Sequence, residues 1–594
     1  MSRSRLRQLL VETLEHLDIG WMTVNSAEEL DELLLYIRSI ADEACLEVAS
    51  RSIRALDRNL AELEFPCSRC GKEMTKNRSQ DRSWETVLGP LELWRTYLEC
   101  RDCKVRFYPQ DARLKLPRAG RMSPHWANGV SHAGAELPYE VASRLVKHLT
   151  GRDVAAKTID DQVQRDGATL HQIECEEADR LWPYDAGGYP RTVDPDTVQS
   201  VRASSVAGPR PVGKVLVMQA DGAMINLAAD PEVKKERAST KKKRRKKGGN
   251  EISPEEEGQP STGSPFRESI QILMYRLDDV VRQRRGKYGK RKKNRGQYRR
   301  ERTMITHKQT IAVVNNPPLV AKQVNRAAKL WNHEQYEVRI FLADGASKLW
   351  DVAQDYFNFT VGILDINHAR SHIHDCAKAL CPREALRAKE WGSEWSRRIL
   401  KEGAMPLLAH LQKIQGERWC EEGTKKLSNL IEYVAKHVVH MEYPDFVAKG
   451  YPIASGAVEG TNKRVLISRC RRAGQQFRRD NAQHLLALRC ALADDRFDHA
   501  MTRVRAQQSY RAMDPPPQVA VIPRTTGPPT PCRISGERIP VPEDPPKRPT
   551  ETTSRNDPDL EKLIPLRKRS RLEREGMSHL LQGGAAPRVA NGLP

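Results

Sequence analysis

The chain has 594 residues, and its 99 lysines and arginines outnumber its 77 aspartates and glutamates to give a formal net charge of +22. This excess favours a polyanionic partner, because each phosphate that a basic side chain neutralises releases counterions. No apolar run approaches the roughly 20 residues of a membrane-spanning helix, and the basic start precedes an acidic helical pattern, which is unlike a signal peptide. These properties argue against a membrane or secreted protein and predict a cytoplasmic, multidomain α+β protein.

The first predicted region is helical and spans residues 1–63. Leu30, Leu34 and Ile37 recur at three- and four-residue steps, which is the stripe of an amphipathic helix. A stripe of this kind serves as a core face or as a self-association surface, so we assign no chemistry to this region.

Two Cys-x-x-Cys pairs follow, and the segment between them is rich in β-forming residues with a Gly89-Pro90 turn. Two such pairs joined by a hairpin supply four thiolates, the closed tetrahedral ligand set of structural Zn²⁺. In a large cytoplasmic chain this interpretation is favoured over disulfides or redox chemistry. We therefore predict a zinc-ribbon-like module at 64–118, with the ligands Cys67, Cys70, Cys100 and Cys103.

Residues 119–180 have helical composition, with predicted helices at 138–149 and 154–167 on either side of a Thr-Gly turn. A pair of short helices around a glycine, the second polar and partly basic, fits a helix-turn-helix that binds DNA. Lys157 and Arg165 on the second helix are its candidate DNA contacts. An ordinary helical hairpin explains the same pattern equally well, so both interpretations stay open.

Strand-like periodicity begins after residue 211, and residues 211–500 are predicted to form one further domain. Alternating strands and helices indicate an α/β sheet, whose sites lie at strand ends. A basic insertion at 234–302 and an all-helical insertion at 370–447 interrupt it. The predicted strands are 215–220, 269–275, 310–314, 338–343 and 359–364.

Three acidic residues of this domain stand in settings that suit metal binding. Asp221 and Asp344 each follow an apolar strand, and Glu459 opens a helical pattern that is dense in arginine. Carboxylates in such places hold two divalent ions, which stabilise the attacking and the leaving oxygen of an in-line phosphoryl transfer. The alternatives are that an Asp-Gly pair only marks a turn and that Glu459 only balances positive charge. Asn462 and Lys463, three and four residues further on, are predicted to position the phosphate from the same helical face.

Asp365, His368 and His372 offer a competing site, because their spacing puts them on one helical face. The two histidines have a zinc-binding spacing, but residue 369 is alanine where a metalloprotease carries its glutamate base. We therefore interpret this group as hydrogen-bonded support for the acidic site. Asp344 and Asp365 both end strands, so the sequence leaves open which of them binds metal.

Runs of basic residues supply the remaining candidate DNA contacts. One run occupies 241–247 and another lies within 282–302, and such runs stay extended because their charges repel. Phosphate contact is the favoured interpretation and a solvated loop is the alternative. The tail 510–594 is Pro-rich, ends basic and is predicted to be disordered. The candidate contacts in the basic run and after the glutamate are Lys241, Lys242, Lys243, Arg244, Arg245, Arg469, Arg471 and Arg472.

The ordered set of motifs resembles the ISKra-type insertion-sequence transposases of the Mutator-like DDE group. The resemblance rests on the two cysteine pairs and on the segments 221–223, 344–350, 363–369 and 455–463. It implies an RNase H-like catalytic domain with a helical insertion before the glutamate. It makes Asp221, Asp344 and Glu459 the DDE residues, with Asp365 and His368 as an accessory element.

The same resemblance implies a DNA transposase that cuts the ends of its element and joins them to target DNA, using two Mg²⁺ or Mn²⁺ ions. Its partners would be double-stranded DNA, as terminal inverted repeats and as target, and further copies of the chain, since two element ends must meet. Such a protein is cytoplasmic and associates with the bacterial nucleoid when bound to DNA. Two alternatives remain: a non-catalytic DNA-binding protein derived from a transposase, and a metal-dependent nuclease without joining activity.

Overall fold

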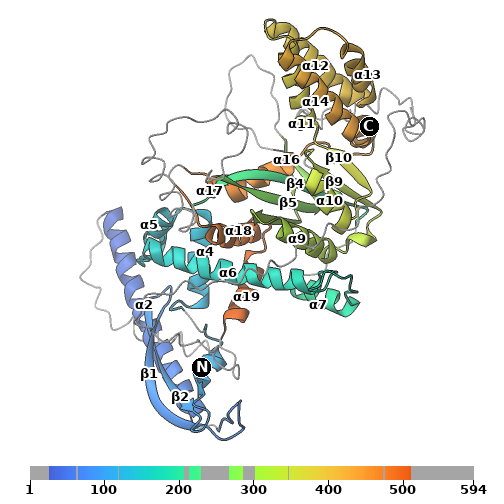
Figure 1. Ribbon diagram of the computed structural model, residues 1–594. Coiled ribbons are helices and arrows are strands. Elements are labelled where there is room, and N and C mark those ends of the chain that lie inside the picture. Colours follow the sequence, from blue (N-terminus) through green and yellow to red (C-terminus); the bar gives the residue numbers. More distant parts are fainter. Residues whose placement is uncertain are drawn as a thin grey trace, which may run out of the picture. The chain divides into compact units, whose positions relative to one another are not determined.

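The computed structural model is a multidomain α+β structure with a mixed five-stranded sheet among helices (Figure 1). Its contacts divide the chain into two compact units, Met1–Leu170 with Phe497–Glu537 and His171–Arg496 with Arg538–Pro594. The basic run 241–247 and the tail 510–594 lie outside the residues that the structure describes. Described are residues 8, 26–61, 64–117, 120–205, 213–228, 266–284, 301–345, 347–472 and 475–509.

The first unit contains the predicted cysteine hairpin. β1 (Thr75–Glu85) and β2 (Pro90–Glu99) pair antiparallel around Gly89. The φ of Gly89 is +145°, a backbone conformation that only glycine adopts without strain. A short strand, β3 (Arg106–Phe107), pairs with the end of β2 that carries Leu98 and so brings the second cysteine pair back to the first.

A single long helix, α2 (Ala27–Ala61), covers the hairpin and confirms the predicted helix over the described residues. Its apolar side chains pack on a buried cluster that includes Trp84 and Leu93. Its buried Asp57 accepts hydrogen bonds from the backbone N–H of Thr96 at 2.9 Å and from the Thr96 hydroxyl at 2.7 Å. A buried carboxylate with two donors on β2 fixes how the helix is rotated on the strand.

Two helices around a glycine turn lie where the sequence predicts them. α5 (Tyr139–Thr150) ends at Gly151, whose φ is +72°, and α6 (Ala156–Arg180) follows. α6 extends well beyond its predicted end, since buried Leu170 and Ala178 continue the apolar spacing of the helix. The observed pair is thus a short helix followed by a long one.

The carboxylate of Asp166 on α6 ties the first unit together. Arg505 on α19 (Phe497–Gln508) donates to it from both terminal nitrogens at 2.6 Å, and Ser131 on α4 (Pro124–Glu136) donates at 2.6 Å. Because both oxygens of this buried group have charged or hydroxyl donors, the desolvation of the carboxylate is offset. The remaining helix of this unit is α3 (Pro109–Leu114).

All five predicted strands are present in the second unit and form one sheet. The strand order is β10-β9-β4-β5-β8. β4, β5 and β8 pair antiparallel, whereas β9 runs parallel to β4 and β10 runs parallel to β9. The strands are β4 (Val215–Asn226), β5 (Phe266–Arg276), β8 (Lys308–Val314), β9 (Val338–Ala343) and β10 (Val361–Leu364).

The centre of this sheet is apolar, which is why its strands read as continuous hydrophobic runs. The core includes Leu216 and Met218 of β4 and Phe341 of β9, each at most 1% exposed. A separate hairpin of β6 (Val280–Arg284) and β7 (Glu301–Ile305) lies between β5 and β8 in the chain. The flanking helices are α7 (Pro195–Ser205), α9 (Pro317–Leu330), α10 (Ser347–Tyr356) and α18 (Arg479–Ala493).

The segment after β10 is helical, as the sequence predicts. α11 packs on α12 and α14, and α13 packs on both of the latter. Apolar side chains of these helices, such as Leu407, Leu411 and Leu430, join the same core as the sheet. The helices are α11 (Ile366–Leu380), α12 (Ala385–Glu402), α13 (Met405–Ile414), α14 (Glu421–His437) and α15 (Tyr443–Ala448).

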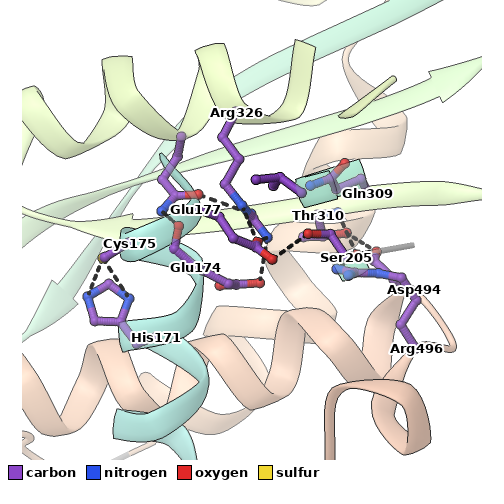
Figure 2. A network of polar contacts seen from close by, with 12 residues as sticks. His171, Glu174, Cys175, Glu177, Ser205, Gln309, Thr310, Arg326, Asp494 and Arg496 are labelled. Carbon is purple, nitrogen blue, oxygen red and sulfur yellow. Dashed lines mark hydrogen bonds and ion pairs between the residues drawn. The ribbon is translucent and has the colours of Figure 1, made fainter. Parts of the chain in front are cut away.

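Buried ion pairs hold the second half of α6 within the second unit (Figure 2). Arg326 on α9 is 2% exposed and donates to Glu177 at 2.7 and 2.9 Å. Glu174 lies 3.7 Å from the same guanidinium, and the hydroxyl of Ser205 donates to the other oxygen of Glu177.

In the described stretches of the chain, no helix has both the length and the apolar character needed to cross a bilayer.

Candidate active site

The sheet brings three of the predicted acidic residues into register. The parallel pairing of β4 with β9 aligns Gln219 with Leu342, and the pairing of β9 with β10 aligns Ala343 with Leu364. Continued along the strands, this register places Asp221, Asp344 and Asp365 side by side. Neighbouring strands lie about 4.8 Å apart, so the three residues meet at the edge of the sheet where β9 and β10 end. Asp344 and Asp365 follow these two strands directly, whereas Asp221 lies within β4, which continues to Asn226, beyond its predicted end.

The helix that carries Glu459 is attached to this edge. α16 (Gly456–Asn462) begins next to Ser455, whose hydroxyl lies 2.5 Å from Asp365 Oδ2 and 3.0 Å from Glu459 Oε1. The buried side chain of Gln219 on β4 accepts a hydrogen bond from the backbone N–H of Val458 at 3.1 Å. First-turn N–H groups have no partner within their own helix, so this amide acts as a cap supplied by the sheet.

Charges at this edge act on one another. Burial raises the pKa of the Asp221 carboxyl above its usual range, and the charges of Asp344 and Glu459 raise it further. The amide of Asn462, which donates to Asp221 at 2.5 Å, opposes the shift, as does His368. Three carboxylates and an imidazole from four elements of the chain thus share one electrostatic site.

The donor set fits a divalent cation in its chemistry, because carboxylate oxygens are the ligands that Mg²⁺ takes in proteins. The three acids do not, however, form a group of ligand atoms as tight as that of the cysteines. Among the described residues, the four cysteines are the one group of three or more ligands whose atoms all lie within 4.8 Å of one another.

The surroundings of Asp344 and Asp365 separate the two candidates for the second metal ligand. Asp365 is 0% exposed, caps α11 by accepting the N–H of Asn367 at 2.9 Å, and accepts the Ser455 hydroxyl with its other oxygen. Asp344 is partly exposed at the end of β9. Both oxygens of Asp365 are therefore engaged in holding the chain.

Asn462 and Lys463, predicted to position a phosphate, have different surroundings. Asn462 is 3% exposed and donates its amide N–H to Asp221, so it orients that carboxylate. Lys463 is exposed, its backbone N–H bonds the carbonyl of Glu459 at helical spacing, and it begins a π-helical turn, Lys463–Ile467. Turns of this kind are frequent at functional sites.

The predicted DNA contacts fall into different environments. Arg469 is 1% exposed and lies over the ring of Phe477 at 5.5 Å, so it packs inside the protein, whereas Arg471 and Arg472 are exposed. Lys157 is exposed and pairs with two aspartates of its own helix. Arg165 is partly buried and donates to a glutamine side chain of α6. The five basic residues Lys241, Lys242, Lys243, Arg244 and Arg245 lie outside the described residues.

The four predicted cysteine ligands come together. Their sulfurs lie within 4.8 Å of one another, with Cys70 Sγ and Cys100 Sγ 3.6 Å apart. Backbone N–H groups point at two of them, from Arg69 to Cys67 at 3.5 Å and from Cys103 to Cys100 at 3.4 Å. The backbone donors lower the pKa of Cys67 to about 7, whereas the neighbouring thiols and burial raise the pKa of Cys103 to about 12. The cluster is consistent with one tetrahedral ion.

The sequence interpretation missed two side chains at the site. Gln219 left a signal, because it is the polar residue of an otherwise apolar strand. Tyr433 on α14 left none, because its place beside Asp344 depends on how the helical segment folds back. In comparisons with known proteins, no protein-family model and no curated protein matches this chain.

Proposed function

We propose that the protein is a DNA transposase of the DDE type, which cleaves the ends of an insertion sequence and joins the freed 3′ hydroxyl to target DNA. The observation that supports this most is that Asp344, just after β9, and Glu459, on a helix fixed to β4, both act electrostatically on Asp221 of the neighbouring parallel strand. If the five strands are numbered by their order in the chain, their order across the sheet is third, second, first, fourth, fifth. This order is the one expected of an RNase H-like domain, and the helical segment before Glu459 is the expected insertion.

Asp221, Asp344 and Glu459 would hold two Mg²⁺ or Mn²⁺ ions. When bound, such ions lower the pKa of the attacking water or hydroxyl and stabilise the leaving oxygen. The chain itself contributes positioning. Asn462 orients the Asp221 carboxylate, and the Gln219 amide fixes the helix of Glu459 on β4. Because phosphoryl transfer leaves little covalent work for the protein, this positioning is its main contribution to the rate.

DNA binding in this proposal is divided between the two units. The hairpin with its four cysteines would hold one structural Zn²⁺ and, with the α5–α6 pair, recognise terminal inverted repeats of double-stranded DNA. Exposed Arg471 and Arg472, which follow the helix of Glu459 in the chain, would contact phosphates, which adds affinity without sequence information. Two element ends must be processed together, so the working form would be a dimer or larger assembly.

The test uses a supercoiled plasmid that carries the DNA flanking the coding region, with Mg²⁺, wild-type protein and the variants Asp221→Asn and Glu459→Gln. We expect wild type to release and join 3′ ends, and both variants to bind the plasmid and do neither. Equal binding with no cleavage in all three would favour the non-catalytic DNA-binding protein. Cleavage without joining would favour the nuclease, and cleavage by either variant would refute the assignment of the acids.

A further inference from the structure

The first unit exposes a cluster of apolar side chains on two of its helices, α2 and α5. Among the described residues seventeen large apolar side chains are exposed, and seven of these belong to the two helices. Single exposed apolar residues are normal on a protein surface, whereas a concentration of them marks an interaction site. The residues of this α2–α5 surface are Leu30, Leu34, Leu35, Tyr36, Val141, Leu145 and Leu149.

The first half of α2 is apolar on all its sides. Residues 33–37 read Leu-Leu-Leu-Tyr-Ile, and successive side chains point about 100° apart around a helix axis. A helix that is apolar all round belongs in a protein interior, yet none of residues 27–40 is buried. The second half differs, because Leu46, Ala49 and Ile53 pack on the hairpin. The first half therefore lacks the cover that the second half has.

α5 presents its exposed apolar residues as a regular row. Val141, Leu145 and Leu149 are four residues apart, so they lie one above the other on the helix. The two helices are neighbours, since Arg38 of α2 donates to the carbonyl of Thr150 at the end of α5 at 3.4 Å (Figure 1). The leucines of both helices nevertheless stay exposed, so within one chain neither row covers the other.

The two parts of the surface carry charges of opposite sign. The exposed leucines of α5 stand among the exposed bases Arg144 and Lys147, against the single acid Glu140. An acidic apolar helix and a basic apolar helix are complementary to one another, whereas each would repel a copy of itself. The exposed acids that flank the leucines of α2 are Glu28, Glu29, Asp31 and Glu32.

We propose that the first unit binds a second copy of this chain through the α2–α5 surface, with the first half of α2 in one copy lying on α5 of the other. Each copy has both helices, so a two-fold axis makes this contact twice. Seven half-exposed side chains in each of two copies amount to on the order of 1,200 Å² of apolar surface, which reaches the lower end of specific interfaces. The proposal goes beyond the proposed function, because it concerns the first unit alone and holds whatever reaction the second unit catalyses.

The chain's own residues 9–25 are a second possible occupant of this surface, and they lie outside the described residues. They also contain leucines, but their acids Glu12, Glu15 and Asp18 have the same sign as those of α2. Like charges repel, so this segment fits α2 less well than the basic α5 of a second copy does.

The test measures the molar mass of the full chain, without DNA or Mg²⁺, by sedimentation over a range of micromolar concentrations. We expect wild type to pass from monomer to dimer in this range. Leu145→Glu should raise the dissociation constant of the dimer about 100-fold or more, because every dimer contains the change twice. Leu386→Glu is the matched control, since Leu386 is an exposed leucine on α12 of the second unit, and it should dimerise as wild type does.

Charge reversal tests the pairing of α2 with α5. Changing Glu28 and Glu32 to lysine should weaken the dimer about 10-fold, and changing Arg144 and Lys147 to glutamate should do the same. A chain with all four changes has a less acidic α2 and an acidic α5, so it should recover most of the wild-type affinity. A chain with all four changes that dimerises more weakly than either double variant would overturn the pairing.

The remaining outcomes are equally decisive. A wild-type chain that stays monomeric throughout the range overturns the proposal, as does a dimer that Leu145→Glu leaves intact. If Leu145→Glu melts clearly below wild type at a concentration where both are monomers, a segment of the same chain covers α5 and the proposal is wrong. A wild-type dimer that binds DNA but never cleaves it would refute the proposed function and leave this proposal standing.

Discussion

Replacing Asp221 by asparagine should stabilise the metal-free protein, although it should abolish activity. Asp221 lies in register with Asp344, and both Asp344 and Glu459 raise its pKa. Neutralising one of three clustered carboxylates removes like-charge repulsion that the folded state bears and the unfolded state does not. Asn462 can accommodate the change, because its amide oxygen has no partner among the described residues. If the Asn462 amide rotates by about half a turn, this oxygen accepts a hydrogen bond from the new amide at position 221 in place of the bond that Asn462 now donates.

The size of the gain can be estimated for charges about one strand spacing apart, about 5 Å. At this distance two unit charges repel by about 3.3 kcal/mol at an effective dielectric of about 20 and by about 0.8 kcal/mol in water. Asp221 is neither fully buried nor fully exposed, so the expected gain lies between these limits, on the order of 1 to 2 kcal/mol. A change of 1 kcal/mol moves the melting temperature of a domain of about 150 to 250 residues by about 2 to 4 °C.

The pH dependence has a definite sign. A carboxyl whose pKa is raised on folding holds its proton more tightly in the folded state, so its contribution to stability is complete below the unfolded-state value. That contribution is lost as pH rises through the raised folded pKa. The ordinary value is 3.8. Asp221→Asn should therefore match wild type near pH 3.8 and exceed it increasingly toward neutral pH.

The assay is thermal unfolding in EDTA and again with Mg²⁺, with Asp351→Asn as control because Asp351 is an exposed acid on α10. Mg²⁺ at 100 times its dissociation constant should stabilise wild type by about 2.7 kcal/mol and leave Asp221→Asn almost unchanged. The reasoning fails if Asp221→Asn is less stable than wild type in EDTA at neutral pH. It fails equally if the control gains as much as Asp221→Asn does.

Three more predictions concern the cysteine cluster, the second acid and the buried ion pair. Purified protein should release one equivalent of zinc to a chelating dye. The Cys70→Ser variant should bind less zinc and have a lower melting temperature. Protein that folds and binds DNA without zinc would contradict this prediction. Asp344→Asn should abolish cleavage and leave stability unchanged. Asp365→Asn should chiefly lower stability, by about 1 to 3 kcal/mol, because both oxygens of Asp365 accept hydrogen bonds. The opposite pattern would exchange the roles of the two residues. Glu177→Ala should lower the free energy of unfolding in urea by about 3 to 5 kcal/mol, because it leaves Arg326 buried without its main partner. The control is Glu334→Ala: Glu334 is exposed and pairs with Lys329, so this change should lower the free energy of unfolding by under about 1 kcal/mol.

The strands and the helices of the second unit were predictable because their signals are local. Runs such as 215–220 and 338–343 are mostly apolar, with one polar residue each (Gln219 and Arg339), and each is followed by an Asp-Gly pair. The cysteine hairpin was equally accessible, since ligand spacing and a glycine turn are written in a short stretch. The length of α6 was underestimated because the polar residues in its second half suggest the end of a helix. Its buried residues nevertheless continue at helical spacing through that part.

The roles of individual polar residues were less accessible. Arg469 and its neighbours Arg471 and Arg472 look alike in sequence, yet only Arg469 is buried among the three. Asp344 and Asp365 both end apolar strands, and their difference lies in the partners that Ser455 and the start of α11 offer to Asp365. Burial and hydrogen-bond partners come from segments distant in the chain, so no local pattern reports them.

By itself the sequence determined which residues can do chemistry here: acids at strand ends, paired cysteines and a basic surplus, each following from the hydrophobic period or the spacing of its own segment. Only the tertiary structure decided which of them meet. Strand register puts Asp221 next to Asp344, the amide of Gln219 brings the helix of Glu459 to the same edge, and the folding back of α14 places the Tyr433 ring beside Gly345. These are contacts between distant parts of the chain, set by the packing of a common core, and no window of sequence contains both partners.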